Sequence, residues 1–502
     1  MNIKPPFILR HVKQDEVKKT LKKLNVNKAS DIYKIKPAII KDLTEYLTPI
    51  LTTLFNKSID EKQYPDTLKE TKIIEIYKSK DNTRPINYRP ISLLPIIAKI
   101  LDKLINNQLM KHLLKHNIIL PTQYAFRPNS NTTLAIQAII NNIHKYTSKY
   151  KPTLAIYIDL TKAYDTISHQ KLLHKFKHEF NFSQNTLLFF ETFFQNRTQS
   201  VHTQHAQSET QIITDGIPQG STLSTTFFIL YINNILNTTT SSNTYIYADD
   251  ITLIITAETP QELQQLAQTE LNKLIKYFYI NDLVPNPTKT TYTIFYPQPQ
   301  QNSPQNIQLH INDKIIENSP QAKLLGIIIQ EDRKYHKTVI NIIKKLQPII
   351  TRFKYANKLL STQKMKQLYY THAYPHLIGS ITIWGTDKHN KEYMQPLIRT
   401  QKKLVRLIKN LPPQTHTKPI MKELKIINII SLYILHTAME VHPHIYSKEN
   451  INRPKHDHNY ISTAQIHEYG TRQTKQRKFY IPNSNLLRKA KITRQQNTQQ
   501  NT

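Results

Sequence analysis

Two adjacent aspartates interrupt an apolar β-like run, and no other sequence feature restricts the fold as strongly. Residues 245–255 read Tyr-Ile-Tyr-Ala-Asp-Asp-Ile-Thr-Leu-Ile-Ile, the pattern of a β-hairpin whose turn carries Asp249 and Asp250. Aspartate is disfavoured in strands and costly to bury, so we expect a partner that compensates the two charges. An ordinary polar turn is the alternative for the pair taken alone, because Asp is a common turn residue.

A third aspartate ends another β-like run. Residues 154–160 alternate between an aliphatic face, which includes Ile156 and Ile158, and a second face that ends on Asp159. Carboxylates gathered at strand ends can hold a pair of hard divalent cations through oxygen ligands. The pattern predicts two-metal phosphoryl transfer, in which metals about 3.5–4 Å apart activate an attacking hydroxyl and stabilise the leaving oxygen. No protein nucleophile is needed for such a reaction.

The charge of the chain indicates a polyanionic partner. Its 502 residues include 68 Lys and Arg against 35 Asp and Glu, a formal net charge of +33. Such an excess favours nucleic acid over the alternative of an anionic membrane surface. The lack of cysteine excludes disulfides, Cys-ligated zinc and a thiol nucleophile. No apolar run approaches the roughly 20 residues that cross a bilayer, so we expect an intracellular protein without a membrane partner.

Apolar periodicity predicts an α+β protein. Helical spacing follows much of the chain and is interrupted by short runs rich in β-branched and aromatic residues. The predicted helices span about 15–56, 96–116, 169–194, 223–236, 260–279 and 339–411. The predicted strands span 72–77, 154–160, 245–255, 292–296, 307–311 and 324–329.

The aspartate segments resemble signature segments of reverse transcriptases. Residues 247–250 (Tyr-Ala-Asp-Asp) are similar to the catalytic tetrad of that family. Residues 158–165 (Ile-Asp-Leu-Thr-Lys-Ala-Tyr-Asp) resemble the palm motif of non-LTR retrotransposon enzymes of the LINE type, jockey/CR1-like. The resemblance implies that Asp159, Asp249 and Asp250 are catalytic and bind two Mg²⁺ ions, or Mn²⁺. It also implies that Tyr164 excludes a nucleotide 2′-hydroxyl, with a core aromatic as the alternative.

Further segments resemble the family's nucleotide-binding and template-binding motifs. Residues 216–221 (Gly-Ile-Pro-Gln-Gly-Ser) are similar to the loop that opens the template-binding helix, and a plain Gly-Pro turn is the alternative. Residues 88–94 resemble the family's segment that binds the triphosphate, and residues 123–127 resemble a segment near the template. Residues 286–290 resemble the segment near the leaving pyrophosphate, and residues 324–326 resemble the primer-grip turn. They assign nucleotide binding to Lys78, Arg89, Tyr164, Gln219, Gly220 and Lys289, and template or primer contact to Arg127, Gly216, Leu325 and Gly326.

The resemblance also implies an architecture, an α+β right-hand polymerase. We expect fingers, an antiparallel palm sheet flanked by helices, a helical thumb and a basic C-terminal region. The expected parts are an N-terminal helical extension at 1–70, fingers at 71–150, a palm at 151–335 with a fingers-like helical insertion at about 169–213, a thumb at 336–415 and the basic region at 416–502.

These patterns predict an RNA-directed DNA polymerase that copies retroelement RNA into cDNA. Its expected partners are template RNA, primer or target DNA and dNTPs, and the resemblance implies a nuclear location. The family's N-terminal endonuclease is not expected in this chain, so we expect target nicking to come from elsewhere or not to occur. Two alternatives stay open: a group II intron-type maturase, and a catalytically dead RNA-binding remnant. The remnant is suggested by departures from the family pattern at Ala125, Thr225 and Asn234.

Overall fold

The structure is a computed structural model, and it describes residues 5–446 except 78–80, 82, 85–86, 204–205, 298–306 and 386–390. The chain divides into two compact units, Met1–Arg333 and Lys334–Thr502. No helix among the described residues is both long enough and apolar enough to span a membrane.

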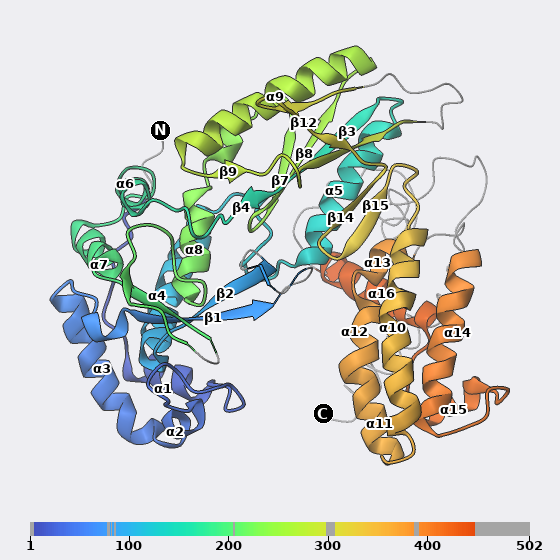
Figure 1. The fold of residues 1–502 in the computed structure, drawn as a ribbon, viewed down its shortest axis with the longest axis horizontal. Coiled ribbons are helices and arrows are strands. Elements are labelled where there is room, and N and C mark those ends of the chain that lie inside the picture. Colours follow the sequence, from blue (N-terminus) through green and yellow to red (C-terminus); the bar gives the residue numbers. More distant parts are fainter. Residues whose placement is uncertain are drawn as a thin grey trace, which may run out of the picture. The chain divides into compact units, whose positions relative to one another are not determined.

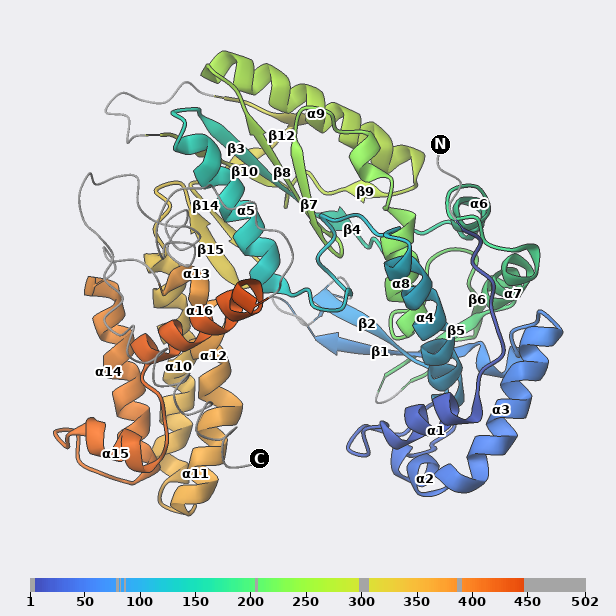
Figure 2. The same cartoon turned by 180° about the vertical axis from the view of Figure 1, so that it is seen from behind.

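The first unit begins with helices that surround a long buried helix, α4 (Ile96–Lys115). The carboxylate of Asp31, from the N-terminal segment, accepts a hydrogen bond from the Ile96 N–H and so caps the start of α4 (2.9 Å). Helix α4 packs along α8, as Figure 2 shows. The bounds of these helices are α1 (Gln14–Lys22), α2 (Pro37–Asp42), α3 (Thr44–Asp60), the 3₁₀ turn η1 (Asp66–Leu68) and α8 (Thr222–Tyr231).

A four-stranded sheet joins segments that are distant in sequence. Its order is β2-β1-β5-β6, and β1 pairs antiparallel with β2 and parallel with β5. The region predicted as one helix at 169–194 is two helices, because residues 179–183 form a turn before Ser183 caps the second one. The bounds are β1 (Glu70–Tyr77), β2 (Tyr88–Leu93), β5 (Thr198–His202), β6 (Gln211–Ile212), α6 (His169–His178) and α7 (Gln184–Phe194).

The central sheet has five strands in the order β13-β10-β3-β8-β7 (Figure 1). Four of them pair antiparallel, as predicted, but the edge strand β13 pairs parallel with β10. The expected antiparallel sheet is thus found in four of the five strands. Strand β13 makes the sheet mixed, because the chain turns back through the small β11–β12 hairpin before β13 lies beside β10. The bounds are β3 (Thr153–Ile158), β7 (Asn243–Tyr247), β8 (Asp250–Thr256), β10 (Thr291–Phe295), β11 (His310–Ile311), β12 (Lys314–Ile315) and β13 (Glu317–Asn318).

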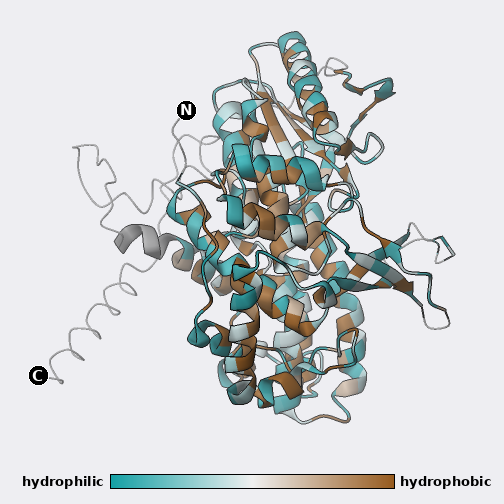
Figure 3. Ribbon diagram, turned by 90° about the vertical axis from the view of Figure 1, so that its left-hand side faces the viewer, coloured by the Kyte–Doolittle hydropathy of each residue, from teal (hydrophilic) through white to brown (hydrophobic). Residues whose placement is uncertain are grey.

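Alternation along the strands separates two faces of this sheet. Ile156 and Ile158 join the main hydrophobic core, together with Leu271 and Leu274 of α9 (Pro260–Ile280). The top helix in Figure 3 is α9, and it carries both hydrophobic and hydrophilic residues. Helix α5 (Thr132–Thr147) also packs on β3, β7 and β8. The sheet is thus covered by amphipathic helices, which is the mixed α+β arrangement that the periodicity predicted.

Two short pairings complete the first unit. Strand β4 (Leu160–Thr161) pairs with β9 (Val284–Pro285). Residues 324–329, predicted as one strand, lie across the turn of a hairpin formed by β14 (Gln321–Leu324) and β15 (Ile327–Gln330). The single-strand prediction failed because Leu325 and Gly326 both have positive φ (+46° and +98°), which reverses the chain.

All the described elements of the second unit are helical. Trp384 and Leu404 are fully buried, and the Trp384 indole donates to the Gly379 carbonyl (2.7 Å). The predicted helical stretch 339–411 is thus several helices. Their bounds are α10 (His336–Ala356), α11 (Thr362–Leu368), the π-helix η4 (Tyr369–Ala373), α12 (Tyr374–Ile378), α13 (Ile381–Trp384), α14 (Lys391–Ile408), α15 (Thr417–Glu423) and α16 (Ile429–Tyr446).

Candidate active site

The two adjacent aspartates lie at the tip of the β7–β8 hairpin. Tyr247 pairs with Asp250, so Ala248 and Asp249 form a two-residue turn. Ala248 adopts φ +56°, a left-handed conformation that is unusual for a residue with a Cβ and that costs on the order of 1–2 kcal/mol. The tight turn carries both residues to the end of the sheet, and both are exposed there. The sequence pattern also placed them at the tip of a hairpin.

The third aspartate lies beside this tip. In the antiparallel register Ile158 pairs with Ile251, which places Asp159 opposite Asp250 at the ends of neighbouring strands. The Asp159 N–H donates to the Thr290 hydroxyl (3.3 Å), and its carbonyl accepts from the Asn286 N–H (2.8 Å). The backbone of Asp159 is therefore fixed by the 286–290 turn, the segment that sequence resemblance placed near the pyrophosphate.

The same turn brings Lys289 to Asp159. The ammonium nitrogen of Lys289 lies 3.4 Å from Asp159 Oδ2, in an ion pair whose side chains are 62% and 38% exposed. Oδ2 itself is buried and, apart from this long contact with Lys289, has no hydrogen-bond partner among the described residues. A buried carboxylate oxygen with one distant cationic neighbour is incompletely satisfied, so this atom is suited to a further positive ligand.

The carboxylates affect one another electrostatically. Loss of hydration, and then the negative charges of Asp249 and Asp159, raise the pKa of the Asp250 carboxyl from 3.8 to about 6. A raised pKa means that the ionised form is disfavoured until a cation arrives. The three groups thus form one acidic site with too little positive charge of its own.

The donor set fits a hard divalent cation, although it is not assembled around one. Three carboxylates offer only oxygen atoms, the ligands that Mg²⁺ and Mn²⁺ prefer. In the described part of the chain, however, no three His, Cys, Asp or Glu residues are grouped closely enough to hold a metal as they stand. In the structure the Asp159 carboxylate makes an ion pair with Lys289.

Tyr164 lies between the hydrophobic core and this acidic site. Its ring stacks on Phe228 of α8 (centroids 4.7 Å apart, 14° between planes) and is partly buried. Burial, and then the charge of Asp249, raise the pKa of the Tyr164 hydroxyl above its usual value. The position is therefore compatible with both readings of this residue, a core aromatic and a group that contacts the nucleotide.

The 216–221 loop bridges the β2 strand and the Asp159 segment by close backbone contacts. A Cβ on Gly216 would lie 2.8 Å from the Asp165 carbonyl oxygen, and one on Gly220 would lie 2.5 Å from that of Ser92. The Gln219 carbonyl accepts from the Ser92 N–H (3.1 Å), and its side-chain amide donates to the Asp165 carboxylate (2.9 Å). The glycines were expected to permit close approach, and here that approach is to the protein's own backbone.

A buried hydrogen-bond network, which sequence reasoning missed, fixes the start of α8. Ser221 caps α8 by accepting from the Leu223 N–H, and its hydroxyl donates to the carboxylate of Asp102. Asp102 is fully buried and also accepts from the Tyr64 hydroxyl (2.9 Å). Burial raises the pKa of the Asp102 carboxyl. Ser221 before an apolar run is a recognisable capping signal, whereas no sequence pattern marks Asp102 as buried.

The remaining predicted site residues are placed at varying distances from the acidic tip. Arg89 is exposed on β2, opposite Ile76 of β1, while Lys78 lies outside the described residues. Arg127 donates to the carbonyls of Leu120 (2.9 Å) and Gln123 (3.3 Å), so its guanidinium stabilises the loop that contains it. The assignments of Arg89 to triphosphate and of Arg127 to template stay predictions.

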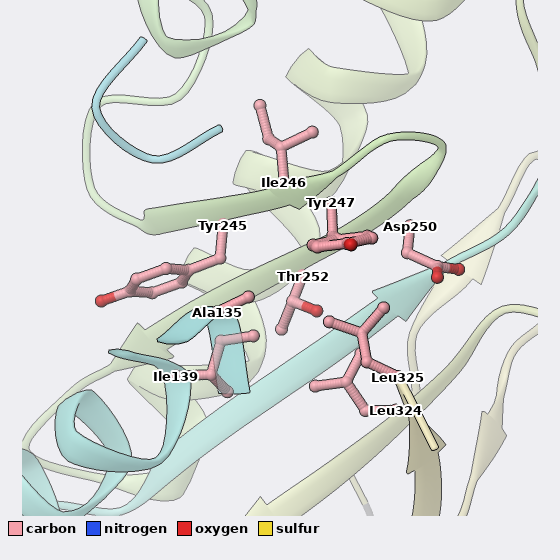
Figure 4. Close-up of a pocket in the computed structure, with 9 residues that line it drawn as sticks. All are labelled: Ala135, Ile139, Tyr245, Ile246, Tyr247, Asp250, Thr252, Leu324 and Leu325. Atoms are coloured by element: carbon pink, nitrogen blue, oxygen red, sulfur yellow. The ribbon is translucent and has the colours of Figure 1, made fainter. Parts of the chain in front are cut away.

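The β14–β15 turn, predicted as a primer grip, meets the β7–β8 hairpin. Leu324 and Leu325 line a small pocket together with Tyr247, Asp250 and residues of α5. Figure 4 shows Leu325 close to Tyr247 and Asp250, with Ile246 pointing away to the other side of β7. Gly326 is exposed at the turn, with no atom within 4 Å of an added Cβ. This turn therefore lies next to the hairpin that carries Asp249 and Asp250.

Comparison with known proteins agrees with the geometry. The family described as Reverse transcriptase (RNA-dependent DNA polymerase) matches residues 76–329, just over half of the chain. A probable RNA-directed DNA polymerase from transposon BS of Drosophila melanogaster is 24% identical over 448 residues, which cover 86% of this chain and 48% of the relative.

Other relatives come from the same kind of mobile element. The RNA-directed DNA polymerase from mobile element jockey of Drosophila melanogaster is 24% identical over 430 residues, 83% of this chain and 46% of the relative. A probable RNA-directed DNA polymerase from transposon X-element of that species is 22% identical over 433 residues, 84% and 47% of the two chains. The chain thus spans about half the length of these curated relatives.

Proposed function

Because this chain belongs to the reverse transcriptase family, we propose that it is an RNA-directed DNA polymerase that copies retroelement RNA into cDNA. The observation that carries the proposal is the β3–β8 register, which sets Asp159 opposite Asp250 and beside the turn that holds Asp249. This acidic tip offers oxygen ligands alone, which suit Mg²⁺ or Mn²⁺. The names of the relatives from transposon BS and jockey support the same activity.

In this proposal Asp159, Asp249 and Asp250 hold divalent cations, with Asp159 turning away from Lys289 to do so. The chemistry that such cations supply is activation of a primer 3′-hydroxyl and stabilisation of the oxygen that leaves with pyrophosphate. Lys289, released from Asp159, then places its ammonium near the negative charge of the leaving group. Arg89 of the β2 strand, together with Lys78, binds the triphosphate, since a guanidinium fork matches phosphate oxygens.

Two further residues select and align the incoming nucleotide. Tyr164, held by its stack on Phe228, blocks a 2′-hydroxyl and so favours dNTPs. Gln219 leaves Asp165 to contact the nascent base pair from a loop that α8 and Ser92 hold in place. Gly216, Gly220 and the turn at Leu325 and Gly326 shape the path of template and primer.

The proposed architecture is the right hand of a polymerase. The N-terminal extension (1–70), fingers (71–150) and palm (151–335) fall mainly within the first unit, and the thumb (336–415) falls mainly within the second. The basic region at 416–502 would hold RNA or target DNA through phosphates. A nuclear location follows from the proposed copying of retroelement RNA beside its DNA target.

The test is primer extension on an RNA template with dNTPs and Mg²⁺. The purified parent should extend the primer, and an Asp249→Ala, Asp250→Ala double variant should not. A parent that is folded and binds RNA but extends nothing would favour the RNA-binding remnant instead. Specific binding of a group II intron, together with splicing activity, would favour the maturase.

A further inference from the structure

The loop before α5 extends the central sheet beside the catalytic hairpin. The Tyr124 N–H donates to the Ile246 carbonyl (2.9 Å), and the Ile246 N–H donates to the Thr122 carbonyl (3.0 Å). Residues 122–124 therefore run along the outer edge of β7 like a short parallel strand. This pairing places Gln123 next to the turn that carries Asp249.

The side chain of Gln123 accepts two backbone hydrogen bonds, and one of them comes from the catalytic turn. Its Oε1 accepts from the Ala125 N–H (2.9 Å) and from the Ala248 N–H (3.3 Å). Because both partners are donors, the oxygen end of the amide is assigned without ambiguity. Gln123 is 2% exposed, and its Nε2 has no partner among the described residues. The amide is thus held in place by its oxygen.

The backbone N–H of Ala248 needs a hydrogen-bond acceptor from the protein. Ala248 is 8% exposed, so its N–H cannot rely on water, and it holds φ +56° without being glycine. A strained conformation persists only where the surroundings determine it. The hydrogen bonds that pair β7 with β8 and β8 with β3 do not involve the Gln123 side chain. We therefore expect the sheet to stay folded when this side chain is replaced, while the turn at Ala248 can change its conformation.

We propose that Gln123 is a positioning residue that holds the Ala248 turn in the conformation in which Asp249 and Asp250 bind divalent cations. It acts through Ala248 and does not touch the cation. This inference rests on the proposed function, because the turn conformation matters to catalysis only if these aspartates are metal ligands. Residues that orient metal ligands typically change metal affinity by about 10–100-fold when they are replaced.

The experiment measures Mn²⁺ binding by electron paramagnetic resonance, without nucleotide or nucleic acid, alongside thermal unfolding. Gln123→Met removes the acceptor at nearly constant size, whereas Gln123→Glu keeps an oxygen acceptor and replaces the unpartnered donor with a second carboxyl oxygen, which adds a negative charge when it is ionised. The matched control is Gln108→Met, because Gln108 is also buried and also bonds to backbone, at Arg10 (3.0 Å for both bonds), away from the acidic tip.

We expect Gln123→Met to weaken Mn²⁺ binding by about tenfold or more, with a change in melting temperature no larger than that of Gln108→Met. Gln123→Glu should bind Mn²⁺ at least as well as the parent, because an added carboxylate favours a cation. Equal Mn²⁺ affinity in Gln123→Met and the parent would overturn the inference, as would equal weakening in Gln108→Met. If the parent and the Asp249→Ala, Asp250→Ala variant bind Mn²⁺ alike, the proposed function fails as well.

Discussion

At the residue scale, the charge of Asp250 links the acidic tip to stability. Its pKa is raised to about 6 from 3.8, so the folded protein holds a proton that the unfolded chain has lost between those values. The free energy of unfolding must therefore fall as the pH rises from about 3.8 to about 6, and this loss is complete above pH 6. Above pH 6, a cation bound at the tip offsets this loss of stability.

Asp250→Asn should therefore raise the melting temperature at pH 8 in the presence of a chelator, and the advantage should disappear near pH 4. Thermal denaturation of parent and variant across this pH range measures the difference. Asp282→Asn serves as the control, since Asp282 makes an exposed ion pair with Lys171 (2.6 Å). Equal melting temperatures for parent and Asp250→Asn at pH 8 would show that neither loss of hydration nor the neighbouring carboxylates disfavour the ionised form of Asp250.

Tyr164 has two candidate roles, a core aromatic and a residue that excludes a nucleotide 2′-hydroxyl. If its ring excludes a 2′-hydroxyl, Tyr164→Val should lower the preference for dNTP over rNTP by about 10–100-fold, because removing a steric barrier of this size changes discrimination by 1–3 kcal/mol. Steady-state kcat/KM for one dNTP and its rNTP counterpart gives the ratio. An unchanged ratio with a lowered melting temperature would identify Tyr164 as a core aromatic stacked on Phe228.

The sequence predicts some site residues far better than others. The sequence identifies Asp159, Asp249 and Asp250 because an aspartate within an apolar β-like run is unfavourable unless a partner compensates its charge. Gln123 was not identified, because its partner Ala248 lies 125 residues away and is a backbone group, which any residue could supply. Asp102 was missed for the same reason, since its partners Tyr64 and Ser221 become neighbours only in the folded chain.

At the element scale, the 216–221 loop depends on two close backbone contacts. Gly220→Ala would place a Cβ 2.5 Å from the Ser92 carbonyl oxygen, and forcing an atom into packed backbone costs about 1–3 kcal/mol. Gly326→Ala meets no atom within 4 Å and adds only backbone strain at φ +98°. We therefore expect the larger loss of unfolding free energy in Gly220→Ala.

Denaturant titration of the two glycine variants measures this difference. The Gly220→Ala variant should also lose primer extension, since the loop that carries Gln219 must shift. Similar unfolding free energies for both variants would indicate that the loop adapts around an added methyl group and does not need glycine at that position.

Elements were predictable where local pattern and tertiary pairing agree. The β7–β8 hairpin and α4 follow directly from apolar periodicity. The parallel pairing of β1 with β5 does not, because it joins residues more than a hundred positions apart and leaves no trace in either strand's own pattern. The apolar pattern of 324–329 alone indicates one strand, because the reversal depends on positive φ at Leu325, a residue that seldom adopts it. The resemblance of 324–326 to the primer-grip turn is what indicated a turn there.

At the scale of the whole molecule, the charge of +33 should dominate nucleic-acid binding. Binding through phosphates releases counterions, so the logarithm of the association constant should fall linearly with the logarithm of salt concentration. Filter binding of RNA from low to moderate salt gives the slope. Affinity that does not change with salt would mean that the basic surface does not contact the phosphate backbone.

In the proposed function, Asp159, Asp249 and Asp250 act together as the cation site for DNA synthesis on RNA. The most direct measurement is the single-turnover rate of one dNTP addition with Mg²⁺, for the parent, for each single Asp→Asn variant of these residues, and for Asp282→Asn. Each of the three should be slower by roughly 1,000-fold or more, since metal stabilisation is worth several kcal/mol and about 1.4 kcal/mol is tenfold in rate. Asp282→Asn should match the parent. Near-parental rates in any of the three would contradict the claim.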